Sequence, residues 1–429
     1  MRLVSTRNPK HRASFAEAVQ GCVPGDGGLY VPDPLPCFRD VSQLLEMDFL
    51  SRSTEILWRL LGEEFSREDL GEVVGQAFNF PVPLQQLRDR FFALELWHGP
   101  TLAFQDFGAR FLAGMLELIS AREGLKLRTI LTATTGNTGA ATAHAFWKRR
   151  GFRVIVLHPK GQIPELQERQ IATLGANVLS YAVEGSYDDC QALVSRCFAD
   201  LELSAQLNLT STNSLNIGRS VAQVVLCFEA VAQLRALSLR DAPVFAVPCG
   251  NFGNLYAGLL AQRLGLPVKA FVIATNENAT VPHYLDTGDY RPRPSVTTLS
   301  GAMDVGTPSN WERIQSHFNG NLEAMRATLR WGSCSDAETR KSMWEMNASG
   351  YLPDPHSAVA HGVLQGRLGL TEVGILLATA HPAKCAELLQ NRMNLTLAMP
   401  AALAELQGRP MQSKSLPADF QTLKTELNN

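Results

Sequence analysis

Residues 128–149 read RTILTATTGNTGAATAHAFWKR and contain one complete structural unit. Arg128–Ala133 is a short run with β-branched residues, which favours a strand. Thr134–Gly139 is a loop of hydroxyl-bearing residues and glycine, and Ala140–Arg149 consists mostly of good helix formers. The stretch therefore predicts a strand, a loop and a helix in succession.

The same alternation continues on both sides of this unit. Further strands are predicted at residues 91–96, 152–157, 176–183, near 207, from 244 to 247 and from 373 to 378. Helices are predicted at residues 107–118, 165–174, 188–198 and 216–234, and after the glycines of residues 250–253 up to 264. Because strands that alternate with longer helices are typical of parallel sheets covered on both faces, we expect an α/β fold.

The length of 429 residues indicates more than one domain. Residues 1–80 combine turn-rich segments with helical periodicity, as in residues 41–58, and predict a mainly helical cap. Residues 81–429 are predicted to form a core of two α/β lobes. The smaller lobe is expected at about 127–225 and the larger at about 81–126 and 226–400. Prolines and glycines indicate an irregular insertion near 280–350.

Composition and charge favour a small-molecule ligand. The formal net charge is -2 without a block of like charges, which argues against nucleic acid or an anionic membrane as the main partner. No signal-peptide pattern or membrane-spanning apolar run is apparent, and the eight cysteines contain no C-x-x-C pair. We therefore expect a cytoplasmic protein without a metal site.

Three loops follow predicted strands, at the edge where open α/β sheets bind ligands. In the first, Thr134, Thr135, Asn137 and Thr138 precede a helix, whose exposed amides and dipole attract an anion such as a carboxylate. Simple capping of the helix by threonine or asparagine is the commoner explanation of such a loop. The first loop alone therefore leaves the choice open.

The second loop is Gly250-Asn251-Phe252-Gly253-Asn254, where two glycines allow close approach and successive N–H groups can surround a phosphate. It matches neither common nucleotide-binding glycine motif, and a plain turn explains it equally well. The third loop places Asn213 and Ser214 before Arg219, a residue suited to bind a phosphate or carboxylate. A surface arginine on a helix is the open alternative.

The order and spacing of these loops and further motifs resemble those of threonine synthases over nearly the whole chain. The matching segments are G-G-L-Y-V-P at 27–32, H-G-P-T-L-A-F at 98–104, T-G-N-T-G at 135–139, Leu174-Gly175-Ala176-Asn177, Asn213-Ser214, residues 250–254, Ala274-Thr275-Asn276, Asp354-Pro355-His356 and Thr379-Ala380-His381-Pro382-Ala383-Lys384. The resemblance implies a fold-type II, tryptophan-synthase-β-like structure and pyridoxal 5′-phosphate (PLP) as cofactor. It also implies a reaction in which O-phosphohomoserine and water give threonine and phosphate, by γ-elimination followed by addition at Cβ.

The resemblance also assigns expected roles to the residues of the loops. The loop from Gly250 to Asn254 would hold the PLP phosphate, Asn137 would bond the 3′-oxygen of the ring, and Thr379 would bond the ring nitrogen. The substrate carboxylate would be received by Thr134, Thr135 and Thr138, and the substrate phosphate by Asn213, Ser214 and Arg219.

Position 105 departs from the family pattern. The threonine synthase motif reads H-G-P-T-x-A-F-K-D-F, and its lysine holds PLP as a Schiff base and moves protons, whereas this chain has Gln105. An amide cannot form an imine and is not basic near neutrality. Loss of a general base alone lowers the rate roughly 10²- to 10⁴-fold. Because lysine and glutamine have similar helix propensities, we expect damage to catalysis and not to folding.

No other lysine matches the motif, and Lys384 belongs to the family's own T-A-H-P-A-K run as a structural or substrate-side residue. Three interpretations remain open: an impaired threonine synthase scaffold with PLP bound at best non-covalently, a non-catalytic relative that binds PLP or phosphorylated amino acids, and a related PLP phospho-lyase or dehydratase. A monomer or homodimer is expected in each case.

Overall fold

Two sheets organise the chain in the computed structural model, which describes residues 1–124 and 126–428. The larger sheet has the order β12-β11-β10-β13-β5-β4, and only β4 is antiparallel to its neighbour. Its strands are β4 (Leu84–Arg88), β5 (Phe91–Glu95), β10 (Val244–Pro248), β11 (Ala270–Thr275), β12 (Leu329–Ser333) and β13 (Gly374–Ala378). The predicted α/β fold is confirmed.

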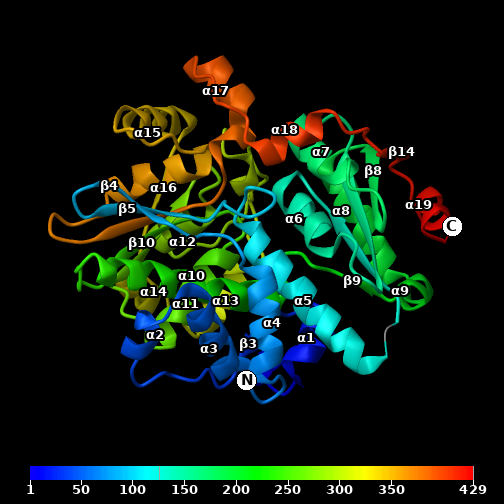
Figure 1. The fold of residues 1–429 in the computed structure, drawn as a ribbon, viewed down its shortest axis with the longest axis horizontal. Helices are drawn as coiled ribbons and strands as arrows, with labels where there is room; N and C mark the ends of the chain where they lie inside the picture. The colour runs from blue at the N-terminus through cyan, green and yellow to red at the C-terminus, as the bar shows by residue number, and fades with distance from the viewer. Residues whose placement is uncertain (125, 429) are drawn as a thin grey trace.

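The smaller sheet has the order β14-β8-β7-β6-β9, with all strands parallel. Its strands are β6 (Arg128–Ala133), β7 (Phe152–Pro159), β8 (Val178–Glu184), β9 (Leu209–Thr210) and β14 (Lys414–Pro417). The strand β14 was not predicted, because its isolated sequence KSLP has no apolar periodicity. Figure 1 shows that the chain returns to this sheet at its end, where β14 and α19 lie beside β8.

Helices connect the strands and lie between and around the two sheets (Figure 1). In the first half of the core they are α5 (Gln105–Glu123), α6 (Asn137–Phe146), α7 (Glu165–Ala172), α8 (Tyr187–Ala199), α9 (Leu201–Leu207), α10 (Ile217–Ala236) and α11 (Gly253–Arg263). The lobe border expected near residue 225 falls inside α10. This helix packs against both α5 and α11. Its most apolar 18-residue stretch is 94% buried, as in the core helix of a globular protein.

The segment from residue 280 to 350 contains more regular structure than its prolines suggested. It forms α12 (Thr280–Thr287), η1 (Gly301–Met303), α13 (Trp311–His317), α14 (Leu322–Thr328), the edge strand β12 and α15 (Asp336–Ala348). The chain then continues through α16 (Pro355–Gln365), η2 (Pro382–Cys385), α17 (Ala386–Met393), α18 (Ala401–Gln407) and α19 (Phe420–Asn428).

The N-terminal region combines helices with a small sheet. The helices α1 (Phe15–Gly21), α2 (Ser42–Glu46), α3 (Phe49–Leu61) and α4 (Arg67–Ala77) accompany an antiparallel sheet of β2 (Arg12–Ala13), β1 (Leu3–Ser5) and β3 (Tyr30–Pro32). The helical periodicity of residues 41–58 falls on two helices, α2 and α3. The side chain of Asp48 accepts a hydrogen bond from Ser51 N at 3.0 Å and starts α3 afresh, which separates it from α2.

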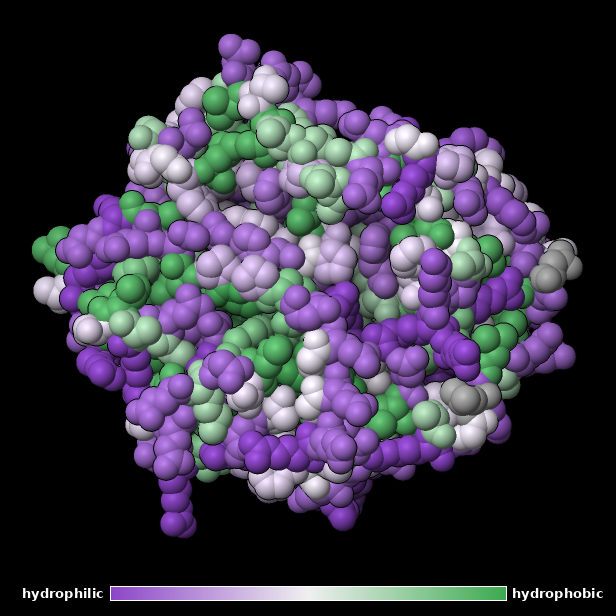
Figure 2. Space-filling view, viewed as in Figure 1, coloured by the Kyte–Doolittle hydropathy of each residue, from purple (hydrophilic) through white to green (hydrophobic). Residues whose placement is uncertain are grey.

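The surface of the molecule is mixed in character. Figure 2 shows hydrophilic side chains over most of the visible face and apolar side chains in separate patches. The apolar side chains of the sheets and of α5, α6, α10 and α11 instead form the core between the layers. The large buried surface therefore holds the strand ends of both sheets in fixed relative positions.

Candidate active site

A cavity of about 1510 Å³ lies at the carboxyl ends of strands from both sheets. The structure brings together in its lining every site residue that the sequence predicted: Gln105, Thr134, Thr135, Asn137, Thr138, Asn213, Ser214, Arg219, Gly250, Asn251, Phe252, Gly253, Asn254 and Thr379. These residues come from five separate segments of the chain. Their convergence in one cavity is the arrangement that the strand-end argument led us to expect.

Gln105 is the first residue of α5 and lies close to the loop that follows β13. The backbone N–H of Phe104 donates to the Thr379 carbonyl at 2.8 Å, and Ala103 pairs with Ala380 as an antiparallel bridge. These backbone contacts fix Gln105 beside Thr379 at the cavity. The Oε1 atom of Gln105 is buried and has no hydrogen-bond partner among the described residues.

The first loop owes its shape to Thr134. The Thr134 hydroxyl accepts hydrogen bonds from the backbone N–H groups of Gly136 at 3.0 Å and Gly139 at 2.9 Å. Gly136 has φ of 144°, a conformation that side chains disfavour. Thr135 and Thr138 lie further out, and the Oδ1 atom of Asn137 is buried without a partner among residues 1–124 and 126–428. Thr134 therefore shapes the loop, while the other three side chains remain available to a ligand.

The second loop forms an open helix N-terminus. Phe252 precedes α11 with φ of 62° and its side chain makes no capping hydrogen bond, while Asn254 Oδ1 accepts from Leu255 N at 2.9 Å in the first turn. Gly250 passes so close to η1 that an added Cβ atom would lie 2.8 Å from the Cα atom of Met303. The first backbone amides of α11 consequently face a space that a phosphate group can enter.

The third loop is joined to the second by side-chain contacts. Asn251 Nδ2 donates to Ser214 Oγ at 2.5 Å, and Asn310 Nδ2 donates to the Ser214 carbonyl at 3.2 Å. The Asn213 side chain accepts from Leu215 N at 2.9 Å and so fixes the turn before α10. The two loops form a continuous polar wall of the cavity.

Arg219 contributes a buried positive charge to this wall. The residue is 4% exposed, and its Nη1 donates to the Thr212 carbonyl at 3.1 Å. Burial lowers the pKa of Arg219 to about 10, and nearby Asp106 opposes this shift, so the guanidinium stays charged at neutral pH. Among residues 1–124 and 126–428 its guanidinium makes no ion pair within 4.0 Å, and Asp106 acts on its charge from further away. A buried cation without a paired anion favours an anionic ligand.

Lys384 also lines the cavity, but its ammonium group is engaged. Its Nζ atom donates to the Thr101 carbonyl at 2.7 Å and to Gln170 Oε1 at 2.6 Å. Burial lowers the pKa of Lys384 to about 8, against the opposing charge of Asp106. Burial likewise raises the pKa of Asp106 to about 6, although Thr101 N donates to its carboxylate at 2.9 Å. This pair fixes the segment before Gln105.

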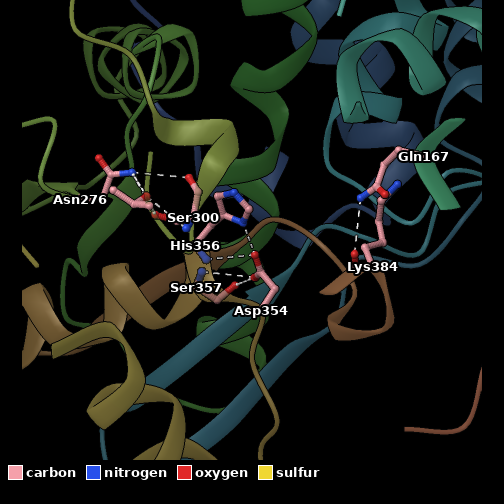
Figure 3. A network of polar contacts seen from close by, with 8 residues as sticks. Gln167, Asn276, Ser300, Asp354, His356, Ser357 and Lys384 are labelled. Carbon is pink, nitrogen blue, oxygen red and sulfur yellow. Dashed lines mark hydrogen bonds and ion pairs between the residues drawn. The ribbon is translucent and has the colours of Figure 1, made fainter. Parts of the chain in front are cut away.

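Gln167, Gln223 and His356 also line the cavity, although they were not among the site residues predicted from the sequence. His356 bonds Asp354 through Nδ1, and in the same view Asn276 donates to the Ser300 hydroxyl at 3.0 Å (Figure 3). Gln167 donates to the Lys384 carbonyl at 3.4 Å on the other side of the view in Figure 3. The motif containing Asp354 and His356 was visible in the sequence, whereas the two glutamines Gln167 and Gln223 stand in helices without any distinguishing pattern.

The cavity fits the PLP group that the resemblance implied. The uncapped start of α11 and the close approach at Gly250 suit a phosphate, while the unpartnered amides of Asn137 and Gln105 suit a polar aromatic ring. Each of these features is a property of the chain's own residues.

Comparisons with known proteins agree with the site. A family model described as the threonine synthase N terminus matches residues 2–78, and one described as pyridoxal-phosphate-dependent enzyme matches residues 78–377. The threonine synthase of Haemophilus influenzae is 44% identical over 427 residues, covering 100% of this chain and 99% of that protein. That of Escherichia coli is 44% identical over 431 residues, covering 100% of both chains.

Solved structures give the same result. The crystal structure of threonine synthase from Escherichia coli has a TM-score of 0.93 at 44% identity and covers 100% of both chains. The PLP-bound threonine synthase from Brucella melitensis has a TM-score of 0.95 at 33% identity, covering 100% of this chain and 98% of that one. On its motifs, its fold and its full-length similarity, the chain belongs to the threonine synthase family of pyridoxal-phosphate-dependent enzymes.

Proposed function

We propose that the chain is a threonine synthase scaffold for the conversion of O-phosphohomoserine and water to threonine and phosphate, and that Gln105 severely impairs it. The observation that carries this proposal is the cavity itself, in which Gln105 stands at the start of α5 among the full set of expected ligand residues. The names of the relatives support the reaction, and the amide at position 105 supports the impairment.

Different residues would bind the cofactor phosphate and the substrate phosphate. The start of α11, from Gly253, would hold the cofactor phosphate, and Asn137 and Thr379 would orient the cofactor ring. Arg219 and Ser214 would bind the substrate phosphate, because Arg219 is charged and buried without a carboxylate partner in the described part of the chain. When bound, the cofactor ring supplies an electron sink for chemistry at the substrate carbons.

The substrate carboxylate would be received by the first loop. Thr135 and Thr138 would donate hydrogen bonds to it, together with the first amides of α6, of which Gly139 N is already bonded to Thr134. Thr134 would act by holding the loop in this shape, because its hydroxyl is already bonded to Gly136 and Gly139.

The Gln105→Lys variant tests the proposal. We expect phosphate release and threonine formation from O-phosphohomoserine to rise at least about 10²-fold over the unaltered chain, because a basic nucleophilic amine returns to the cavity. The Gln105→Arg variant is the matched control, since it restores the charge without a nucleophilic amine, and it should stay inactive. A folded Lys variant that binds PLP and forms no threonine would overturn the proposed reaction.

The same assay separates the remaining alternatives. A related lyase or dehydratase would release a keto acid in place of threonine, so product identification by NMR distinguishes the two reactions. A non-catalytic binding protein, favoured by Gln105 itself, would bind phosphorylated ligands in the unaltered chain and gain no turnover in the Lys variant. A cytoplasmic location and a monomeric or homodimeric state remain predictions of the sequence.

A further inference from the structure

The cavity is lined by amide side chains whose oxygen atoms lack hydrogen-bond donors. The buried oxygens Oε1 of Gln105, Oδ1 of Asn137, Oε1 of Gln167 and Oε1 of Gln223 have no partner among the described residues, and all four residues line the cavity. A buried carbonyl oxygen without a donor destabilises the protein, because burial removes the water that would otherwise bond it. Four such acceptors around one cavity indicate a site that is completed by a ligand with N–H groups.

Two cations that line the cavity are bonded to other groups. Lys384 lines the same cavity, but its Nζ atom already donates to the Thr101 carbonyl and to Gln170 Oε1. Arg219 donates to the Thr212 carbonyl and belongs to the wall formed with Ser214. A bound molecule with N–H groups can therefore supply donors to these four amide oxygens.

The residue at position 105 determines which substituent of the bound ligand has to carry the N–H donors. A lysine at this position reacts with the aldehyde of PLP, whereas the Gln105 amide can only hydrogen-bond the substituent at the same ring carbon. The PLP aldehyde offers an acceptor oxygen and no donor. A protonated aminomethyl group at that carbon offers three N–H donors and a positive charge, and hydrogen bonds from charged donors are stronger than those from neutral ones.

We propose that the chain as it stands selects the amine form of the cofactor, pyridoxamine 5′-phosphate, over the aldehyde form, with Gln105 Oε1 accepting a hydrogen bond from the amine. This inference rests on the proposed function, because the start of α11 holds the phosphate of either form. The preference arises at Gln105 and is assisted by Asn137, whose oxygen is also buried without a donor in the described ranges.

The test is calorimetric titration of the unaltered chain with three ligands that share ring and phosphate. Pyridoxamine 5′-phosphate carries the amine, pyridoxine 5′-phosphate carries a neutral hydroxyl, and PLP carries the aldehyde. We expect the amine to bind roughly 10- to 100-fold more tightly than the aldehyde, with the alcohol between them. Equal affinities, or tighter binding of the aldehyde, would overturn the inference.

Two variants localise the effect. In Gln105→Met the side chain keeps its length and loses the acceptor, so the preference for the amine should fall to within about threefold. In Gln105→Glu the acceptor gains a negative charge, so the preference should rise. If the Met variant retains the full preference, Gln105 is not its source. The Glu variant keeps the test decisive if the Met variant fails to fold.

The Gln105→Lys variant distinguishes failure of this inference from failure of the proposed function. It should reverse the order and attach PLP covalently, which appears as a mass increase after borohydride reduction. If this variant attaches PLP while the unaltered chain shows no amine preference, only the present inference fails. If neither protein binds any of the three phosphates, the assignment of the cavity to this cofactor fails as well, and both proposals are overturned.

Discussion

Single residues of the cavity differ in whether they face a ligand or hold the loop that does. Thr134 is the clearest example, because its hydroxyl accepts two backbone hydrogen bonds from its own loop. Gly139 packs so closely on it that an added Cβ atom would lie 2.3 Å from Thr134 Cγ2. The sequence placed Thr134 with the carboxylate-binding threonines, and the hydrogen bonds support a role in loop geometry.

We expect Thr134→Val to destabilise the fold, because the replacement has nearly the same shape but leaves two backbone N–H groups without an acceptor. The free energy of unfolding, from urea denaturation, should fall by about 1–3 kcal/mol. Thr134→Ser is the matched control, since it keeps the hydroxyl, and should lose less than Val. Equal stability of the Val variant and the unaltered chain would contradict a structural role for the hydroxyl.

At the scale of the elements, helix pairs are joined by polar groups that are buried in their neutral state. His361 of α16 contacts Ser342 of α15, with 2.6 Å between His361 Nδ1 and Ser342 Oγ, and its Nε2 lies 3.2 Å from Gln365 Nε2. Burial lowers the pKa of His361 to about 4. The α15–α16 pair behind the larger sheet therefore requires an uncharged imidazole.

This requirement predicts a loss of stability in acid. Unfolding returns the pKa of the imidazole to about 6.5, so between about pH 6.5 and 4 the unfolded chain binds the extra proton and stability falls as pH falls. For His361 alone the loss from pH 7.5 to 5 is about 2 kcal/mol. In His361→Gln, urea denaturation at the two pH values should show a pH-dependent loss smaller by about this amount. An unchanged difference would show that this histidine is not the source.

At the scale of the whole molecule, the end of the chain completes a sheet that begins almost three hundred residues earlier. The strand β14 pairs with β8, and the buried side chains of Leu416, Phe420, Leu423 and Leu427 pack in the same cluster as Tyr181 and Leu193. The smaller sheet thus depends on a segment that lies outside the range 127–225 in which the sequence located the smaller lobe.

We expect Leu423→Ala to lower the free energy of unfolding by about 2–5 kcal/mol, because Leu423 is fully buried between α19 and the smaller sheet. Leu201→Ala is the matched control, since Leu201 is 81% exposed, and it should change stability by less than about 0.5 kcal/mol. Hydrogen exchange adds a local measurement, in which the amides of β8 should lose protection in the Leu423 variant. Retained protection there would argue against the dependence of the sheet on α19.

Regular elements were predictable wherever local sequence decides them. The strand at residues 128–133 was predicted with its observed bounds, and α5, α8 and α10 were predicted to within a few residues. The predictions failed where a single capping contact sets the start of a helix or where a strand forms only by pairing with a distant segment. Asp48 divides the helical stretch of residues 41–58 into α2 and α3, and β12 and β14 form because neighbouring strands offer them hydrogen bonds.

Some site residues were likewise recognisable from local sequence motifs, and others only from their neighbours in the folded structure. The motifs around residues 105, 137, 213, 252 and 379 were recognisable from residue order, and all of them line the cavity. The lining residues Gln167 and Gln223 were not recognisable, because a glutamine on a helix has the same local pattern whether it faces solvent or a ligand. Their unpartnered oxygens became visible only when their surroundings were known.

By itself, the sequence determined the alternation of strands and helices, the family motifs and the amide at position 105, since all of these are properties of adjacent residues. Only the tertiary structure decided that Arg219 is buried and makes no ion pair within 4.0 Å among residues 1–124 and 126–428, that Thr134 is engaged within its own loop, and that Lys384 donates to Thr101 and Gln170. These features depend on which distant segments meet. Burial and hydrogen bonding are set by three-dimensional neighbours, and residue order along the chain does not specify them.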